Sequence, residues 1–218
     1  MRIAKIESCA LAEFDDSITS VVFFQGCDSN CKYCQNPQLI EKDGGEEKRW
    51  QDVILELQLN YVDWVSLTGG EVLVQDDEDG ILELCMAAKE YKPSLKINID
   101  MSSNATLSKG LFLARLAPHL DCITIGVKDW SRRHLENLMT VLAMAGIDRK
   151  KCRYCTVVVD SFDLDNQLAL DMLAAGMRDV RILPNSGQGR GKNLPATSTK
   201  LVEDMQQFYA PCGIDFHL

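Results

Sequence analysis

Three cysteines, Cys27, Cys31 and Cys34, lie within eight residues at the spacing Cys-x3-Cys-x2-Cys. An apolar segment at 21–25 precedes them and predicts a buried strand that leads into a loop starting at Gly26. Three thiols on one short loop favour a metal centre over a disulfide framework. Structural zinc sites usually take four protein ligands, whereas iron–sulfur clusters are held by thiolates, and three would leave one iron of a cubane open. A zinc knuckle, or a chance grouping of thiols, is the alternative.

Length and charge restrict the class of protein. The chain has 218 residues and a net charge of −9, from 23 basic and 32 acidic side chains. This length suits one domain, and the acidic balance does not favour binding to nucleic acid or to an anionic membrane. No run of 18 apolar residues predicts a membrane span, and the first residues do not resemble a signal peptide. We therefore expect a cytoplasmic protein without nucleic-acid or membrane partners.

The other six of the nine cysteines have different expected roles. Cys85 and Cys122 lie in apolar runs and are expected to be buried. Cys152 and Cys155 form a close pair that, with Cys212, could bind a second cluster or zinc. Two ligands are too few for either centre, and the pair lies at the start of an expected strand. Structural thiols, distant from the chemistry, are the favoured interpretation.

Apolar strands and amphipathic helices alternate along the chain. Each expected strand is followed by apolar residues at helical spacing, and the strands are expected at 21–25, 64–67, 95–99, 122–125, 154–159 and 180–183. This order predicts an α/β protein with a parallel sheet, and the apolar strands suggest that both sheet faces are covered. An open doubly wound sheet and a barrel both fit the periodicity. Residues 1–20 are expected to form an N-terminal extension, as an outer strand or hairpin, and 186–197 a flexible lid loop.

Polar residues follow the expected strands and favour the barrel. Thr68 to Glu71, Asp100 to Asn104 and Gly126 to Asp129 come after three successive strands, as the cysteine loop does after the first. In barrels, the chemistry gathers at the carboxyl ends of the strands. We therefore expect these segments to meet at one site.

The cysteine loop resembles the signature of the radical S-adenosylmethionine (radical SAM) enzymes. The resemblance implies that Cys27, Cys31 and Cys34 hold a [4Fe-4S] cluster whose fourth iron is chelated by S-adenosylmethionine. Tyr33 fits the aromatic residue that is typical before the last cysteine. The implied fold is a partial (β/α)6 TIM-like barrel with outer helices, formed by a single domain at 1–218.

Two further segments resemble cofactor-binding motifs of this family. Gly69, Gly70 and Glu71 resemble its Gly-Gly-Glu motif, which receives the amino group of the methionine moiety; a plain turn is the alternative. The segment with Ser102 and Asn104 resembles one that binds the ribose and carboxylate of the cofactor. A helix cap is the other explanation for these two residues, and both roles are compatible.

The region 22–37 looks most like the short activating enzymes of pyruvate formate-lyase and anaerobic ribonucleotide reductase, although Gln35 replaces a usual histidine. Lys128 lies where these enzymes carry a lysine that would contact the cofactor carboxylate or another anion, while Gly126 replaces their aspartate; a solvated lysine at the rim is the alternative. The resemblance implies an anaerobic oxidoreductase that cleaves S-adenosylmethionine to a 5′-deoxyadenosyl radical. That radical would take a hydrogen atom from a glycine of a glycyl-radical enzyme, with a flavodoxin or ferredoxin-type reductant. The abstraction needs no general acid or base, so no catalytic side chain is named.

Two other functions stay open. One is a radical SAM enzyme that acts directly on a small molecule or peptide, such as a relative of carboxydeazaguanine synthase; Gly126 and the unusual loop at 186–192 favour it. The other is a metal-binding electron carrier or scaffold without catalytic activity.

Overall fold

The computed structural model describes residues 1–218 except 12, 15–16, 105, 160–161, 163 and 186. The strands are β1 (Arg2–Ala10), β2 (Thr19–Phe24), β3 (Glu46–Glu47), β4 (Trp64–Gly69), β5 (Lys96–Ser102), β6 (Cys122–Gly126), β7 (Cys152–Val158), β8 (Asp179–Pro184) and β9 (Asp215–His217). The helices are α1 (Trp50–Glu56), α2 (Glu78–Tyr91), α3 (Leu107–Leu116), α4 (Arg132–Met144), α5 (Asn166–Ala174) and α6 (Thr199–Tyr209). Short 3-10 helices include η2 (Val72–Val74) and η5 (Gly189–Asn193).

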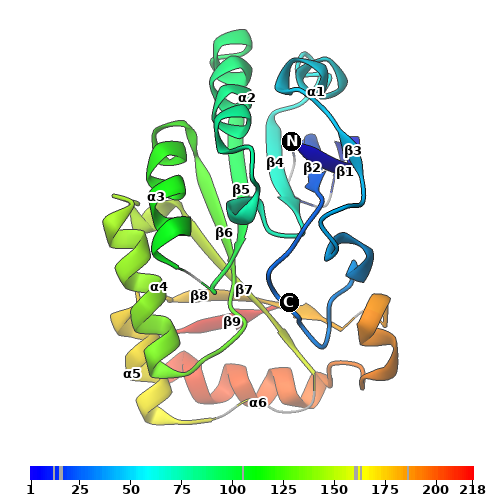
Figure 1. Ribbon diagram of the computed structural model, residues 1–218. Helices are drawn as coiled ribbons and strands as arrows, with labels where there is room; N and C mark the ends of the chain where they lie inside the picture. Colours follow the sequence, from blue (N-terminus) through cyan, green and yellow to red (C-terminus); the bar gives the residue numbers. More distant parts are fainter. Residues whose placement is uncertain (12, 15–16, 105, 160–161, 163, 186) are drawn as a thin grey trace.

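All the strands belong to one sheet in the order β3-β1-β2-β4-β5-β6-β7-β8-β9. β1 pairs antiparallel with β2 and β3, and every pairing from β2 to β9 is parallel. Six strand–helix units, from β2–α1 to β8–α6, are therefore followed by a last parallel strand. The α/β fold and the parallel sheet are confirmed. Of the outer strand or hairpin expected within residues 1–20, the structure shows β1, an outer strand that pairs antiparallel with β2. The sheet curves as a partial barrel, and no pairing between β3 and β9 closes it within the described residues (Figure 1).

Only the outer face of the sheet packs against the helices. On β5, Ile97, Ile99 and Met101 are buried in the hydrophobic core, while Asn98 and Asp100 line a cavity on the inner face. β6 and β7 alternate in the same way, since successive side chains of a strand point to opposite faces. The expectation that both faces are covered by apolar packing was therefore wrong: the inner face carries polar side chains around a cavity.

Two strand boundaries differ from the predicted ones and matter for the site. β5 continues to Ser102, so Asp100 and Ser102 lie within the strand rather than after it. β7 begins at Cys152, two residues earlier than expected, so that Arg153 also belongs to the sheet. The described part of the chain contains no helix with the length and hydropathy needed to cross a bilayer.

Candidate active site

A cavity of about 430 Å³ lies on the inner face of the sheet and brings together most of the predicted site residues. Those that line it are Cys27, Cys31, Tyr33, Cys34, Gly69, Gly70, Glu71, Ser102 and Lys128. They come from loops or strand ends at the carboxyl edge of β2, β4, β5 and β6, which is where a barrel gathers its chemistry. Asn104 does not line the cavity: it is exposed, and its N–H donates to the Ser102 hydroxyl at 3.1 Å. Its contact with a cofactor stays a prediction.

The cysteine loop is anchored at its start by backbone hydrogen bonds. Gly26 turns the chain with a φ of 101°, and its N–H donates to the Leu39 carbonyl at 2.8 Å. The Cys27 N–H donates to the Ile40 carbonyl at 3.1 Å. These bonds fold the loop over the carboxyl end of β2, so that its three thiols border the cavity.

The thiols of Cys27, Cys31 and Cys34 are free and half-buried. Among the described residues, no three histidine, cysteine or acidic side chains converge on one point that a single metal ion could occupy. A cubane cluster does not need such convergence, because each thiolate binds a different iron. A loop of three free thiols around one cavity fits a cluster, whereas a closed zinc site needs a fourth ligand.

The glycine turn after β4 lies directly against the cysteine loop. A Cβ at Gly70 would stand 2.1 Å from the Gly26 carbonyl oxygen, and one at Gly69 would stand 2.3 Å from the Phe24 nitrogen. The Glu71 N–H donates to that Gly26 carbonyl at 2.9 Å. Only glycine allows the two backbones to approach so closely.

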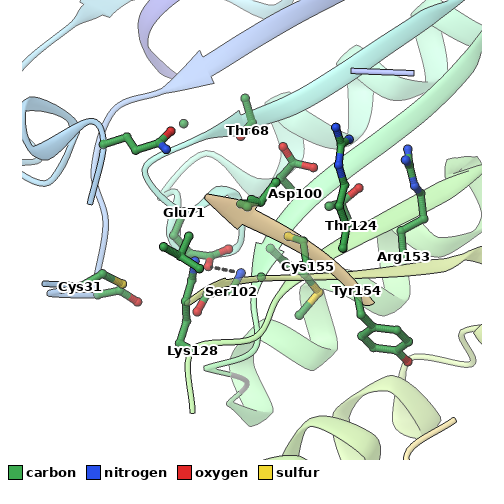
Figure 2. Close-up of a pocket in the computed structure, with 18 of the residues that line it drawn as sticks. Cys31, Thr68, Glu71, Asp100, Ser102, Thr124, Lys128, Arg153, Tyr154 and Cys155 are labelled. Carbon is green, nitrogen blue, oxygen red and sulfur yellow. Dashed lines mark hydrogen bonds between the residues drawn. The ribbon is translucent and has the colours of Figure 1, made fainter. Parts of the chain in front are cut away.

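Glu71 connects the turn to β5 instead of pointing freely into the cavity. One carboxylate oxygen accepts from the Ser102 N–H at 2.9 Å, and the other accepts from the Leu73 N–H at 3.2 Å (Figure 2). Burial raises the pKa of Glu71, and the nearby Lys109 ammonium opposes that shift. Sequence reasoning gave Lys109 no role, because a lysine in the first turn of a helix carries no motif.

Lys128 takes the space that Gly126 leaves empty. Its ammonium lies 2.9 Å from the position of a Cβ at Gly126 and 5.7 Å from the centre of the Tyr33 ring. The Ser103 hydroxyl accepts from the Lys128 N–H at 2.9 Å and bonds the His134 ring at 2.8 Å. Gly126, which replaces the aspartate of the activating enzymes, therefore leaves room for the Lys128 ammonium to extend into the cavity beside Tyr33.

Arg153 and Cys155 of β7 lie on the side of the cavity opposite Cys31 of the cysteine loop (Figure 2). Val157 of β7 and Arg181 and Leu183 of β8 also line the cavity, and we call these five residues the far wall. Among the described residues, neither arginine forms an ion pair. Arg153 instead places its guanidinium 4.8 Å from the centre of the Phe14 ring. The sequence signalled none of these residues except Cys155.

The expected position of Cys155, distant from the chemistry, was wrong. Its thiol lies on the far wall because β7 begins at Cys152 and Cys155 is its fourth residue. Burial raises the pKa of Cys155 to about 11, so the thiol stays protonated at neutral pH. Cys85 and Cys122 are buried, as expected.

Asp100 of β5 also lines the cavity. Its carboxylate accepts from the Asn98 side chain at 2.8 Å, and Asn98 also donates to the Ser66 hydroxyl at 2.9 Å. Burial is the largest influence and raises the pKa of Asp100, although hydrogen bonds from Asn98, Thr68 and Thr124 oppose it.

The glycine-rich segment after β8 contacts the cysteine loop. Within η5, the Arg190 N–H donates to the Cys34 carbonyl at 2.9 Å, and the Arg190 guanidinium bonds the Asn30 side chain. Asn185 holds the segment with its side-chain amide, which donates to the Gly191 and Pro195 carbonyls at 3.0 and 2.9 Å. Figure 1 shows this orange segment beside the blue cysteine loop. Residue 186 of the predicted lid lies outside the described residues, and the mobility of 187–197 stays a prediction.

The family model named Radical SAM superfamily matches residues 21–143. The chain belongs to the radical SAM superfamily. The matched residues include the cysteine loop, the glycine turn, Ser102 and Lys128. The side of the cavity that these residues form is therefore the part that the superfamily shares. Membership makes the protein an enzyme of the radical SAM type and implies an iron–sulfur cluster and S-adenosylmethionine.

Curated relatives of this radical SAM protein are activating enzymes. It is 38% identical over a 92-residue alignment to the pyruvate formate-lyase-activating enzyme of Clostridium pasteurianum, covering 38% of each chain. It is 32% identical over 77 residues to the pyruvate formate-lyase 1-activating enzyme of Escherichia coli K12, covering 35% of this chain and 30% of that one. A putative glycyl-radical enzyme activating enzyme of Methanocaldococcus jannaschii is 24% identical over 101 residues, with coverage of 45% and 40%. The matches therefore span less than half of each relative.

Among solved structures, the radical SAM chain resembles Streptococcus suis SuiB bound to precursor peptide SuiA. The TM-score is 0.63 at 16% identity, and the match covers 90% of this chain and 47% of that one. This likeness extends over most of the chain and supports the partial-barrel fold.

Proposed function

We propose that the protein holds a [4Fe-4S] cluster on Cys27, Cys31 and Cys34 and activates a glycyl-radical enzyme. The observation that supports this function best is the meeting of the cysteine loop, the glycine turn and Ser102 around one cavity. When bound, the cluster and S-adenosylmethionine would supply the radical chemistry for hydrogen-atom abstraction from a glycine of the partner.

The chain's own residues would orient the cofactor and exclude water. The edge of the turn at Gly69 and Gly70 lines the cavity, where its backbone carbonyls would accept from the ammonium of the methionine moiety. Ser102 and Lys128 line the cavity with polar groups that would bind the ribose or the carboxylate. Tyr33 covers this region as a partly buried ring, and burial raises the pKa of Tyr33 to about 12, so it stays neutral.

The names of the curated relatives support a protein partner, since each is an activating enzyme. A flavodoxin or ferredoxin-type protein is the proposed electron donor. The relatives extend well beyond the matched segments, so the identity of the partner is part of the proposal.

A second candidate is a radical SAM enzyme that transforms an acidic small molecule or peptide directly. Arg153 and Arg181 favour it, because two guanidinium groups without an ion pair among the described residues suit a carboxylate on a substrate. The solved neighbour is bound to a precursor peptide, which is compatible with this candidate.

Cofactor cleavage tests the chemistry first. The protein would be reconstituted anaerobically with iron and sulfide, treated with dithionite and S-adenosylmethionine, and assayed for 5′-deoxyadenosine. We expect Cys31→Ala to lower cleavage at least about 100-fold. Cys9→Ala removes an exposed thiol outside the cavity and is the matched control, with unchanged cleavage. No cleavage by the wild type, with zinc in place of iron, would refute the proposal.

The two candidates are then separated by substrate. The reduced, loaded enzyme would be mixed with a glycyl-radical enzyme from the same organism, and the glycyl radical would be measured by electron paramagnetic resonance. A radical on the partner supports activation. Its absence, together with deuterium transfer between the cofactor and an acidic small molecule or peptide, supports the second candidate.

A further inference from the structure

Lys109 is a buried lysine that the proposed reaction does not use. It lies in the first turn of α3, where Thr106 caps the helix, and its side chain is only 2% exposed. Lysine is almost never fully buried unless its charge is paired. Its surroundings therefore indicate what the ammonium group does.

The Lys109 ammonium contacts all three segments around the proposed cofactor site. It lies 3.0 Å from a carboxylate oxygen of Asp28 in the cysteine loop and 3.9 Å from Glu71 in the glycine turn. It also donates to the Asn104 carbonyl, between β5 and α3, at 2.8 Å. The same oxygen of Glu71 that faces Lys109 accepts from the Ser102 N–H. One cation thus joins segments that are far apart in sequence.

The carboxylates of Glu71 and Asp28 depend on the Lys109 charge to different extents. Glu71 is 2% exposed and would be an uncompensated buried charge without the ammonium. Asp28 is 36% exposed, so water can solvate it in the absence of an ion pair. Asp28 follows Cys27 directly, and its contact with Lys109 therefore fixes the cysteine loop more than it stabilises the core.

We propose that Lys109 is a positioning residue which, through Asp28, holds the cysteine loop in register with the turn at Gly69–Glu71. The tether itself is a property of the metal-free chain. Its consequence for catalysis rests on the proposed function: it would set where the cluster lies relative to the cofactor, and small displacements of reacting groups have large effects on rate.

Asp28→Ala tests the tether while leaving buried Lys109 with Glu71 as its counter-ion. Its matched control is Asp121→Ala, which removes a carboxylate of similar exposure, 37%, that pairs with Lys89, accepts from the Ile97 N–H and does not line the cavity. Hydrogen–deuterium exchange would be measured on the full-length, metal-free proteins. We expect amides at 27–36 to exchange about two- to fivefold faster in Asp28→Ala, with no change there in Asp121→Ala. Unchanged exchange in Asp28→Ala would overturn the proposal.

Lys109→Arg is the conservative variant, because arginine keeps the positive charge. Amide exchange at 27–36 in this variant should therefore stay close to that of the wild type.

In the loaded enzyme, we expect Asp28→Ala to lower the kcat of cofactor cleavage about tenfold, with KM for S-adenosylmethionine within about twofold. A rise in KM with unchanged kcat would assign Asp28 to cofactor binding and overturn the positioning role. If the wild type cleaves no cofactor, the proposed function fails, while the exchange experiment still decides the tether.

Discussion

The two sides of the cavity differ in how their side chains are held. The near wall, formed by the cysteine loop, the turn at Gly69–Glu71 and Ser102, is joined by hydrogen bonds and by a buried lysine. The far wall carries Arg153 and Arg181, which form no ion pair among the described residues. The superfamily match ends at residue 143, before β7 begins at Cys152. The comparison suggests that the shared part of the fold is preorganised for the cofactor, while the remainder is left for the substrate.

Gly70→Ala should have the largest effect on cofactor cleavage. Its Cβ would stand 2.1 Å from the Gly26 carbonyl oxygen, and backbone cannot yield as a flexible side chain can. We expect 5′-deoxyadenosine formation to fall about 100-fold or more, as for loss of a preorganised contact. Gly146→Ala is the control: its φ of 66° makes alanine unfavourable by about 1 kcal/mol, but the added Cβ meets nothing within 4 Å. Near-normal cleavage by Gly70→Ala would show that the near wall is not rigid.

Lys109→Met should have the largest effect on stability. It leaves Glu71 buried without its cation, and breaking a buried pair in this way costs about 3–5 kcal/mol. Thermal unfolding would measure the loss, at about 2–4 °C per kcal/mol for a chain of this size. The double variant Lys109→Met with Glu71→Gln should recover part of it. A single variant as stable as the wild type would contradict the preorganised near wall.

Substitutions on the far wall should separate substrate turnover from cofactor cleavage. We expect Arg153→Gln and Arg181→Gln to leave cleavage without substrate within about twofold, because neither residue touches the near wall. Turnover of an acidic substrate should fall about tenfold or more, the loss expected for a charge-assisted hydrogen bond. Both rates would be followed by mass spectrometry. An equal fall in the two rates would place these arginines in the cofactor machinery.

Asp100→Asn should have the smallest effect, and one that depends on pH. Because burial raises the pKa of Asp100 in the folded chain, the wild type loses stability as pH rises from the ordinary carboxyl range through that raised value. Asparagine keeps an acceptor for the Asn98 amide and does not titrate. The variant should therefore unfold at a higher temperature than the wild type at neutral pH and match it below about pH 4. The opposite trend would mean that the cavity stabilises the charged form.

The residues of the near wall could be predicted because the motifs that mark them are local in sequence. Cys27, Cys31 and Cys34 are close in sequence, and the glycines of the turn follow a recognisable strand, so neither depends on the tertiary fold. Lys109 could not be anticipated, because its partners Asp28 and Glu71 meet only when α3 packs over the ends of β2 and β4.

The far wall escaped prediction for a different reason. Arg153 and Cys155 face the cavity because of the register of β7, and a strand shifted by one residue exchanges its two faces. The start of β7 was placed two residues too late, at Tyr154, since the β-branched residues that mark the strand come after it. The sequence therefore signalled the strand but not which of its residues face the cavity.

The hydrogen bonds between η5 and the cysteine loop bear on how the enzyme matures. Arg190 contacts Asn30 across 160 residues of sequence, and its N–H bonds the Cys34 carbonyl. During synthesis, the cysteine loop leaves the ribosome long before the segment that completes its surroundings, and chains generally fold from the N-terminus. The three thiols are therefore present on the nascent chain before η5 has been synthesised. A cluster delivered at that stage would meet an incomplete binding site.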